Sequence, residues 1–220
     1  KDKMEKSTLS LIKIMSMGNS STVHKGSIVI ALGSPLGTNY SILTGNITST
    51  GNEISTQDSN YSVYTTDIVA NKNASGILIN TDGEMIGVVM QNYSAASTGA
   101  LTAVDVTELN RIMELLYASK DVPYLGAHIS TVTDKIANTY GIPKGVYIKE
   151  VEMDSPAMNA GLQSGDVIQK IDDKDITTDD SYTDAVLGLT PGETYSVVFM
   201  REGSNGYKEL TCEIEAGILK

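Results

Sequence analysis

Short runs of apolar and β-branched residues alternate with polar turns over the first half of the chain. The clearest runs are SIVIALG (27–33), SILTGNITS (41–49), YSVYTTDIV (61–69) and EMIGVV (84–89). Clusters of Gly, Asn, Ser and Thr, such as STGNE, separate them. Many short strands spaced in this way are typical of an antiparallel barrel or sandwich. The pattern therefore predicts a mainly β first domain.

The period of the pattern changes in DVTELNRIMELLYASK, residues 105–120. Apolar side chains recur there at intervals of three and four, from Leu109 to Tyr117. This spacing predicts a helix from about 106 to 118, with Asp105 or Thr107 as its N-cap. Pro123 disfavours helix in the residue before it, so KDVP at 120–123 is the expected domain boundary.

Beyond this boundary the chain again has the pattern of strands, now interrupted by two short helical segments. Roughly 95 residues with this mixture fit one small α+β domain. The strand-like runs are YLGAHIS, GVYIKEV, DVIQKID, YSVVFMRE and LTCEIE, and the helical ones are SPAMNAG and DSYTDAVLGL.

Charge separates the two halves and excludes some partners. The net charge is -11, and residues 121–220 carry 17 acidic against 8 basic residues, compared with 10 against 8 in residues 1–120. Such an acidic surface repels phosphate, so we expect no nucleic acid or anionic lipid partner.

The single Cys212 forms no internal disulfide, and no motif has metal-ligand spacing, so we expect no metal and no cofactor. No apolar run is long enough to cross a membrane, but the first residue is Lys, so we expect an anchor or signal upstream.

The string SPAMNAGLQSGDVIQKIDDKDI, residues 155–176, resembles the PDZ domain attached to HtrA proteases, and YLGA (124–127) stands where that family has its carboxylate-binding loop. Gly126 allows the backbone to approach an anion, and successive N–H groups can then bind it. The resemblance implies that peptides or protein C-termini bind between the loop, the strand after it and the second helix. The implied peptide-binding residues are Tyr124, Leu125, Gly126, Ala127, His128, Ile129, Tyr182, Ala185 and Val186. The alternative is a PDZ fold that serves only in packing between domains, with its groove filled.

The first domain is similar to the latter part of the trypsin-like domain of the same family. The matching segments, in the family's order, are HKGSIVIALGSPLG, ILTGNITSTG, DGEMIGVV and GALTAVDVTELNRIMELL. The implied fold is mainly β, the C-terminal lobe of a chymotrypsin-like β-barrel protease followed by an α+β PDZ domain. Residues 1–17 would be the end of the N-terminal lobe, 18–120 the barrel lobe with its closing helix, and 121–220 the PDZ domain.

Serine-protease chemistry needs a nucleophilic Ser, a His base and an Asp that orients the His. The family's Asp opens a strand that here reads STLSLIKI (7–14), which puts Thr8, without a charge, at the Asp position. The family's His would lie upstream of this chain. We interpret His24 and His128 as an ordinary surface and an ordinary groove histidine.

The nucleophile loop falls in DIVANKNASGILIN, residues 67–80. Counted from Thr66 and Asp67, the nucleophile is Ser75, the oxyanion glycine is replaced by Asn73, and Ile77 stands where the family has a second Gly. Counted back from DGE, Ala74 takes the nucleophile position instead. Both alignments leave the chain with at most one member of the triad.

These observations favour a degenerate HtrA-like protein, a pseudoprotease that binds peptides or protein C-termini in envelope quality control or signalling. The alternative is an active serine endopeptidase with Ser75 as nucleophile and its His in a missing upstream segment. We expect an extracytoplasmic protein, anchored to the membrane through an upstream segment, and homo-oligomers if the N-terminal lobe is present.

Overall fold

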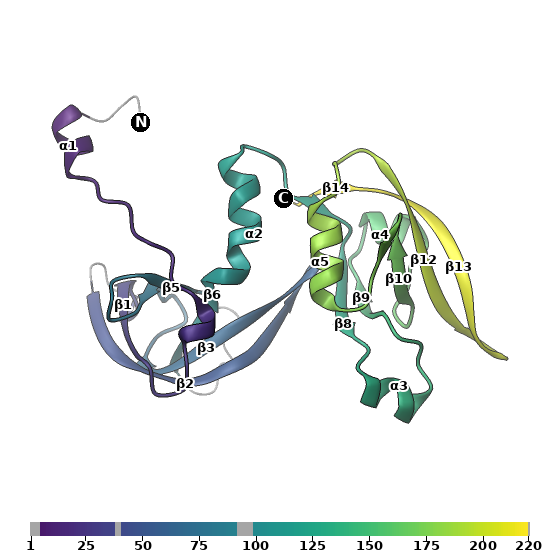
Figure 1. The fold of residues 1–220 in the computed structure, drawn as a ribbon, viewed down its shortest axis with the longest axis horizontal. Coiled ribbons are helices and arrows are strands. Elements are labelled where there is room, and N and C mark those ends of the chain that lie inside the picture. The colour runs from purple at the N-terminus through teal and green to yellow at the C-terminus, as the bar shows by residue number, and fades with distance from the viewer. Residues whose placement is uncertain (1–4, 38–40, 92–98, 220) are drawn as a thin grey trace. The chain divides into compact units, whose positions relative to one another are not determined.

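The computed structural model describes residues 5–37, 41–91 and 99–219 and divides into two compact units (Figure 1). The first unit comprises Lys1–Asn52 and Ser62–Leu109, and the second comprises Glu53–Tyr61 and Asn110–Lys220. The turn between strands β2 and β3 therefore belongs to the second unit. Across the described ranges, no helix is long and apolar enough to cross a membrane.

Unit 1 is a closed β-barrel with the strand order β1-β2-β3-β6-β5-β4. Its strands are β1 (Ile28–Ser34), β2 (Ser41–Thr56), β3 (Ser59–Val69), β4 (Ser75–Ile79), β5 (Met85–Val89) and β6 (Ala100–Asp105). Alternate side chains such as Val29 and Ala31 point inward and are at most 1% exposed, as the period of two along a strand requires. The predicted barrel is confirmed.

Helix α2 (Val106–Tyr117) follows β6 where the sequence predicts a helix. Asp105 is its cap, because its Oδ1 accepts a hydrogen bond from the N–H of Thr107 at 2.7 Å. The Tyr64 hydroxyl donates to the other carboxylate oxygen of Asp105 at 2.9 Å. Of the two candidate caps, Asp105 therefore has this role, and it also ties the start of α2 to the barrel strand β3.

The segment expected as a strand at 7–14 instead contains the short helix α1 (Lys6–Leu11). A strand needs a neighbour for its backbone hydrogen bonds, whereas a helix satisfies them within one segment. Among the described residues, no strand pairs with this segment, and the side chains of Leu11 and Ile14 are 80% and 96% exposed. The prediction of a strand at 7–14 is wrong here, and the 3-10 helix η1 (Ser20–Thr22) follows before the barrel begins.

Unit 2 contains a sheet with the order β13-β12-β10-β9-β8, to which β11 adds on β10, and a separate pair β14-β7. Its strands are β7 (Pro123–Tyr124), β8 (Ala127–Thr131), β9 (Val146–Val151), β10 (Val167–Ile171), β11 (Lys174–Asp175), β12 (Thr194–Gly203), β13 (Gly206–Glu215) and β14 (Gly217–Ile218). Its helices are α3 (Asp134–Tyr140), α4 (Pro156–Asn159) and α5 (Asp179–Leu187). Strand β8 is the last strand of this order, so it has a neighbouring strand, β9, on one side only.

A partly buried ion pair joins two parts of unit 2. The Asp166 side chain is 1% exposed, and it accepts two hydrogen bonds at 2.7 Å from Nε and Nη2 of Arg201. The same Nη2 donates to the Gly161 carbonyl at 2.7 Å, while the N–H of Gln163 donates to Asp166. The Asp166 carboxylate is thus fully partnered. The hydrogen bond to Asp166 raises the pKa of the Arg201 guanidinium.

We expect Arg201→Met to lower the free energy of unfolding of unit 2 by about 3 kcal/mol, because it leaves a buried carboxylate without its cation. Urea unfolding followed by tyrosine fluorescence measures the change. Lys208→Met is the control, because Lys208 is an exposed residue of the paired strand β13. Equal stability of the two variants would show that the pair contributes nothing.

Candidate functional site

Most of the residues implied by the PDZ resemblance gather around one loop of unit 2. Tyr124 ends β7, Leu125 and Gly126 form the loop, and β8 begins at Ala127. Helix α5 supplies Tyr182, Ala185 and Val186. The side chains of Leu125, Ala127, Ile129, Tyr182, Ala185 and Val186 are at most 1% exposed and belong to one core. The site is therefore made mainly by the backbone of the loop and of β8, with these side chains packed behind it.

The loop holds a carboxylate, that of Asp58. Oδ2 of Asp58 accepts hydrogen bonds from the N–H groups of Leu125 and Gly126, both at 2.7 Å, and Oδ1 accepts one from Ala127 at 3.0 Å. The Tyr182 hydroxyl donates a fourth hydrogen bond to Oδ1 at 2.7 Å. Three consecutive backbone N–H groups that converge on one carboxylate form an anion-binding nest.

The backbone of Asp58 is also held between β8 and α5. Its N–H donates to the Ala127 carbonyl at 2.8 Å, so Asp58 adds to the edge of β8 in the way of a strand residue. Its carbonyl accepts a hydrogen bond from the Thr183 hydroxyl on α5 at 3.0 Å. Asn60 donates to the Ile129 carbonyl at 3.3 Å and to Asp179 at 2.9 Å. The turn thus lies against the edge of β8 and against α5, where the resemblance places the peptide-binding site.

Burial decides the electrostatics of this cluster. Asp58 is 5% exposed, and desolvation raises the pKa of its carboxyl, although the hydrogen bonds from Gly126, Ala127, Tyr182 and Leu125 act in the opposite direction. Burial, and then the neighbouring Asp58, raise the pKa of Tyr182 well above its ordinary value, so Tyr182 is a hydrogen-bond donor at neutral pH. A charge in such a place is tolerable only because every oxygen is partnered.

Gly126 has no room for a side chain. Its φ is +89°, in the left-handed region, and a Cβ there would lie 2.6 Å from the Tyr124 hydroxyl and against the Ser155 side chain. Only glycine fits a backbone that is both left-handed and this closely packed.

His128, the second residue of the predicted peptide strand, is hydrogen-bonded within unit 2. Its Nε2 lies 2.8 Å from Oε1 of Glu152. Hydrogen bonds from His128 and then Gln57 lower the pKa of Glu152. Gln57 precedes Asp58 in the turn, so the turn contacts both the loop and the rim around His128.

The nucleophile loop is a tight turn in unit 1. The N–H of Asn73 donates to the side-chain oxygen of Asn71 at 2.8 Å, so it is not free to stabilise an oxyanion. Ala74 is buried, whereas Ser75 is exposed at the first position of β4. Of the two candidate nucleophile positions, only Ser75 is open to solvent.

The histidine of unit 1 lies far from Ser75 along β1. Ser75 pairs with Ser34 at the end of β1, whereas His24 lies in the turn before its beginning and accepts a hydrogen bond from the N–H of Ser27. Strand β1 runs from Ile28 to Ser34, which at 3.3 Å per residue is about 20 Å. His24 is therefore no base for Ser75, and Thr8 lies exposed in α1.

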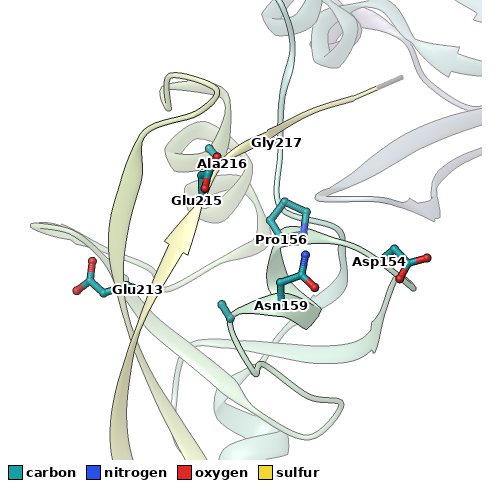
Figure 2. Close-up of a pocket in the computed structure, with 8 residues that line it drawn as sticks. Asp154, Pro156, Asn159, Glu213, Glu215, Ala216 and Gly217 are labelled. Atoms are coloured by element: carbon teal, nitrogen blue, oxygen red, sulfur yellow. The ribbon is translucent and has the colours of Figure 1, made fainter.

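A shallow pocket elsewhere in unit 2 has several acidic residues but no converging set (Figure 2). Its lining includes Asp154, Asn159, Glu213 and Glu215, and Figure 2 shows Asp154 and Glu213 pointing away from Pro156. Within the described ranges, no three His, Cys, Asp or Glu side chains are placed to hold a metal ion. The lining residues of this pocket include acidic side chains but no Lys or Arg, so the pocket is unsuited to binding a carboxylate.

Asp58, Asn60 and Thr183 are the site residues that the sequence alone did not indicate. STQDSN is a polar turn by composition, and its contact with Leu125 spans 67 positions in the chain. The only local signal is the pair Gln57–Asp58 between two strand-like runs, which predicts a hairpin turn but not what the turn binds.

Comparisons with known proteins agree with this geometry. A family profile described as PDZ domain matches residues 123–214. A probable periplasmic serine endoprotease DegP-like of Pseudomonas fulva is 32% identical over 92% of this chain and 43% of its own length. The human serine protease HTRA3 is 26% identical over 87% of this chain and 47% of its own length.

A solved structure of the HtrA-type protease AlgW with a decapeptide is also similar. It superposes with a TM-score of 0.60 at 25% identity, over 94% of this chain and 64% of that one. The chain spans less than half the length of the curated relatives named above. The recognition made from SPAMNAGLQSGDVIQKIDDKDI and the barrel segments is confirmed: this chain is HtrA-like, a trypsin-like barrel followed by a PDZ domain.

Proposed function

We propose that this chain belongs to a catalytically degenerate HtrA-like protein whose PDZ domain binds peptides or protein C-termini. The observation that carries the proposal is the loop of Leu125, Gly126 and Ala127, whose three N–H groups hold a carboxylate at 2.7–3.0 Å. A peptide C-terminus presents the same group, and an extended peptide can pair with the edge strand β8. The decapeptide in the AlgW structure supports peptide binding as a property of similar proteins.

The degenerate part of the proposal rests on the barrel. Thr8 stands at the position of the family's Asp and has no charge to stabilise an imidazolium. Two of the three glycines of the family's Gly-x-Ser-Gly-Gly loop are replaced, by Asn73 and Ile77. His24 lies at the other end of β1 from Ser75. The rival is an active serine endopeptidase, favoured by the names of the relatives and by the exposure of Ser75.

Labelling with a fluorophosphonate separates the two functions. We expect the full-length protein to label no more than its Ser75→Ala variant, because a serine without a base is a weak nucleophile. A solved member of the same family with an intact triad is the positive control. Labelling that disappears in Ser75→Ala would establish the enzyme and end the pseudoprotease proposal.

The location and assembly of the protein are part of the same proposal. Several relatives are named periplasmic, which supports an extracytoplasmic place and a role in envelope protein quality control or signalling. Anchoring through an upstream segment and assembly through an N-terminal lobe remain predictions of the sequence, and membrane fractionation and light scattering of the full-length protein test them.

A further inference from the structure

Asp58 meets the carboxylate loop as a peptide C-terminus would. Its carboxylate takes the N–H groups of Leu125, Gly126 and Ala127, and its own N–H pairs with the Ala127 carbonyl. A bound C-terminal residue has the same two elements, a carboxylate for the loop and an N–H for the edge strand. The two ligands therefore need the same atoms and cannot bind together.

The turn is built to present this one side chain. Strand β2 ends at Thr56 and β3 begins at Ser59, so Asp58 is the second residue of a two-residue turn. Its φ is +58°, a conformation in which Asn and Asp are the usual non-glycine residues. Asp58 and the next residue, Ser59, are 5% and 6% exposed, so the carboxylate-bearing end of the turn is buried although it is polar.

One buried polar atom next to the docked turn lacks a hydrogen bond. Oδ1 of Asn60 is buried and, among the described residues, has no hydrogen-bond partner. An orphaned buried acceptor disfavours the docked state, since water would satisfy it once the turn leaves. The printed contacts of Asp58 with the loop and with α5 are hydrogen bonds, and hydrogen bonds to the same donors can be made by another carboxylate.

We propose that Asp58 is a built-in ligand of the PDZ loop, and that a C-terminal peptide binds only by displacing the Gln57–Ser59 turn. This inference rests on the proposed peptide-binding function and adds its regulation. The apparent affinity for an external peptide is then reduced by the fraction of molecules in which the turn is undocked. If 99% of molecules hold the turn docked, the apparent affinity falls about 100-fold.

The test measures the binding of peptides to the whole chain and to Asp58→Asn. Twenty fluorescent peptides of sequence Gly-Ser-Gly-Ala-Val-X, each with a different last residue and a free carboxylate, are titrated by fluorescence anisotropy, beside the same set with a C-terminal amide. Asn keeps the left-handed turn but places an N–H₂ group against the loop's donors. Asp154→Asn is the matched control, because Asp154 is an exposed Asp of unit 2 with the same φ of +58°.

The expected result is that the best free-acid peptide binds Asp58→Asn at least tenfold more tightly than it binds wild type or Asp154→Asn, with no gain for the amides. In ¹⁵N spectra, the Leu125, Gly126 and Ala127 amides should lose their protection from exchange in Asp58→Asn. Equal affinity in all three proteins would overturn the built-in ligand and leave the proposed function standing. Binding to none of them would instead overturn the proposed function.

A second variant guards against failure of Asp58→Asn to fold. Asp58→Gly removes the carboxylate and suits a positive φ, so it should keep the turn. It should bind the peptides as Asp58→Asn does. If Asp58→Gly folds and binds no more tightly than wild type, the proposal is wrong.

Discussion

Replacing Gly126 by alanine should abolish carboxylate-dependent peptide binding. The variant is made in the Asp58→Asn background, where the loop is free for an external ligand. A Cβ at this position would lie 2.6 Å from the Tyr124 hydroxyl and against Ser155, so the loop backbone must shift. The N–H groups of Leu125 and Gly126 would then no longer converge on one carboxylate.

The expected loss can be estimated from the hydrogen bonds. Each bond to a charged group contributes about 1.5–3 kcal/mol, so the loss of two should weaken binding at least 100-fold, or about 2.7 kcal/mol. Titration of the free-acid and amide peptides measures it, and the preference for the acid should fall close to one.

Gly141→Ala is the control for this substitution. Gly141 also has a positive φ, +69°, but a Cβ there would meet no atom within 4 Å. It therefore carries the conformational cost of alanine without the steric one. If Gly126→Ala keeps its preference for the acid, or loses no more affinity than Gly141→Ala, the loop is not the carboxylate site.

The parts of the fold that the sequence predicted are those that depend on neighbours in the chain. The alternation of apolar residues in SIVIALG forms β1, and the three-four spacing after Asp105 forms α2. The strand predicted at 7–14 was wrong, because a short apolar run suits either a helix or a strand. The presence of a partner strand decides between them.

Of the candidate site, the sequence predicted the loop but not the group that the loop binds. The string YLGA identifies the loop, because Gly126 and the backbone after it are local features. The ligand of the loop could not be predicted, since Asp58 reaches it through a contact across 67 positions. The sequence left open whether the peptide groove is free or filled. In the structure, the Asp58 carboxylate occupies the carboxylate-binding loop.

Gly76 illustrates the same distinction in the barrel, and its replacement by alanine should have the largest effect on stability. Gly76 follows Ser75 as the second residue of β4, and the sequence alone does not show which strand it meets. In the structure it pairs with Gly33 across β1 and β4, the two strands that close the barrel. Its φ is +138°, and a Cβ would collide with the Leu32 carbonyl and lie 3.1 Å from the Gly33 Cα.

We expect Gly76→Ala to destabilise unit 1 by about 3 kcal/mol or more, because alanine there combines an unfavourable φ with a backbone collision that separates β1 from β4. Gly83→Ala should cost only about 1–2 kcal/mol, since Gly83 has a φ of +81° in the β4–β5 turn and nothing within 4 Å of its Cβ position. Hydrogen exchange read by mass spectrometry measures each unit separately, and protection should fall in β1 and β4 but not in β9 and β10. If both variants lose the same small amount, Gly76 is not needed to close the barrel, and the close approach of β1 and β4 tolerates a side chain.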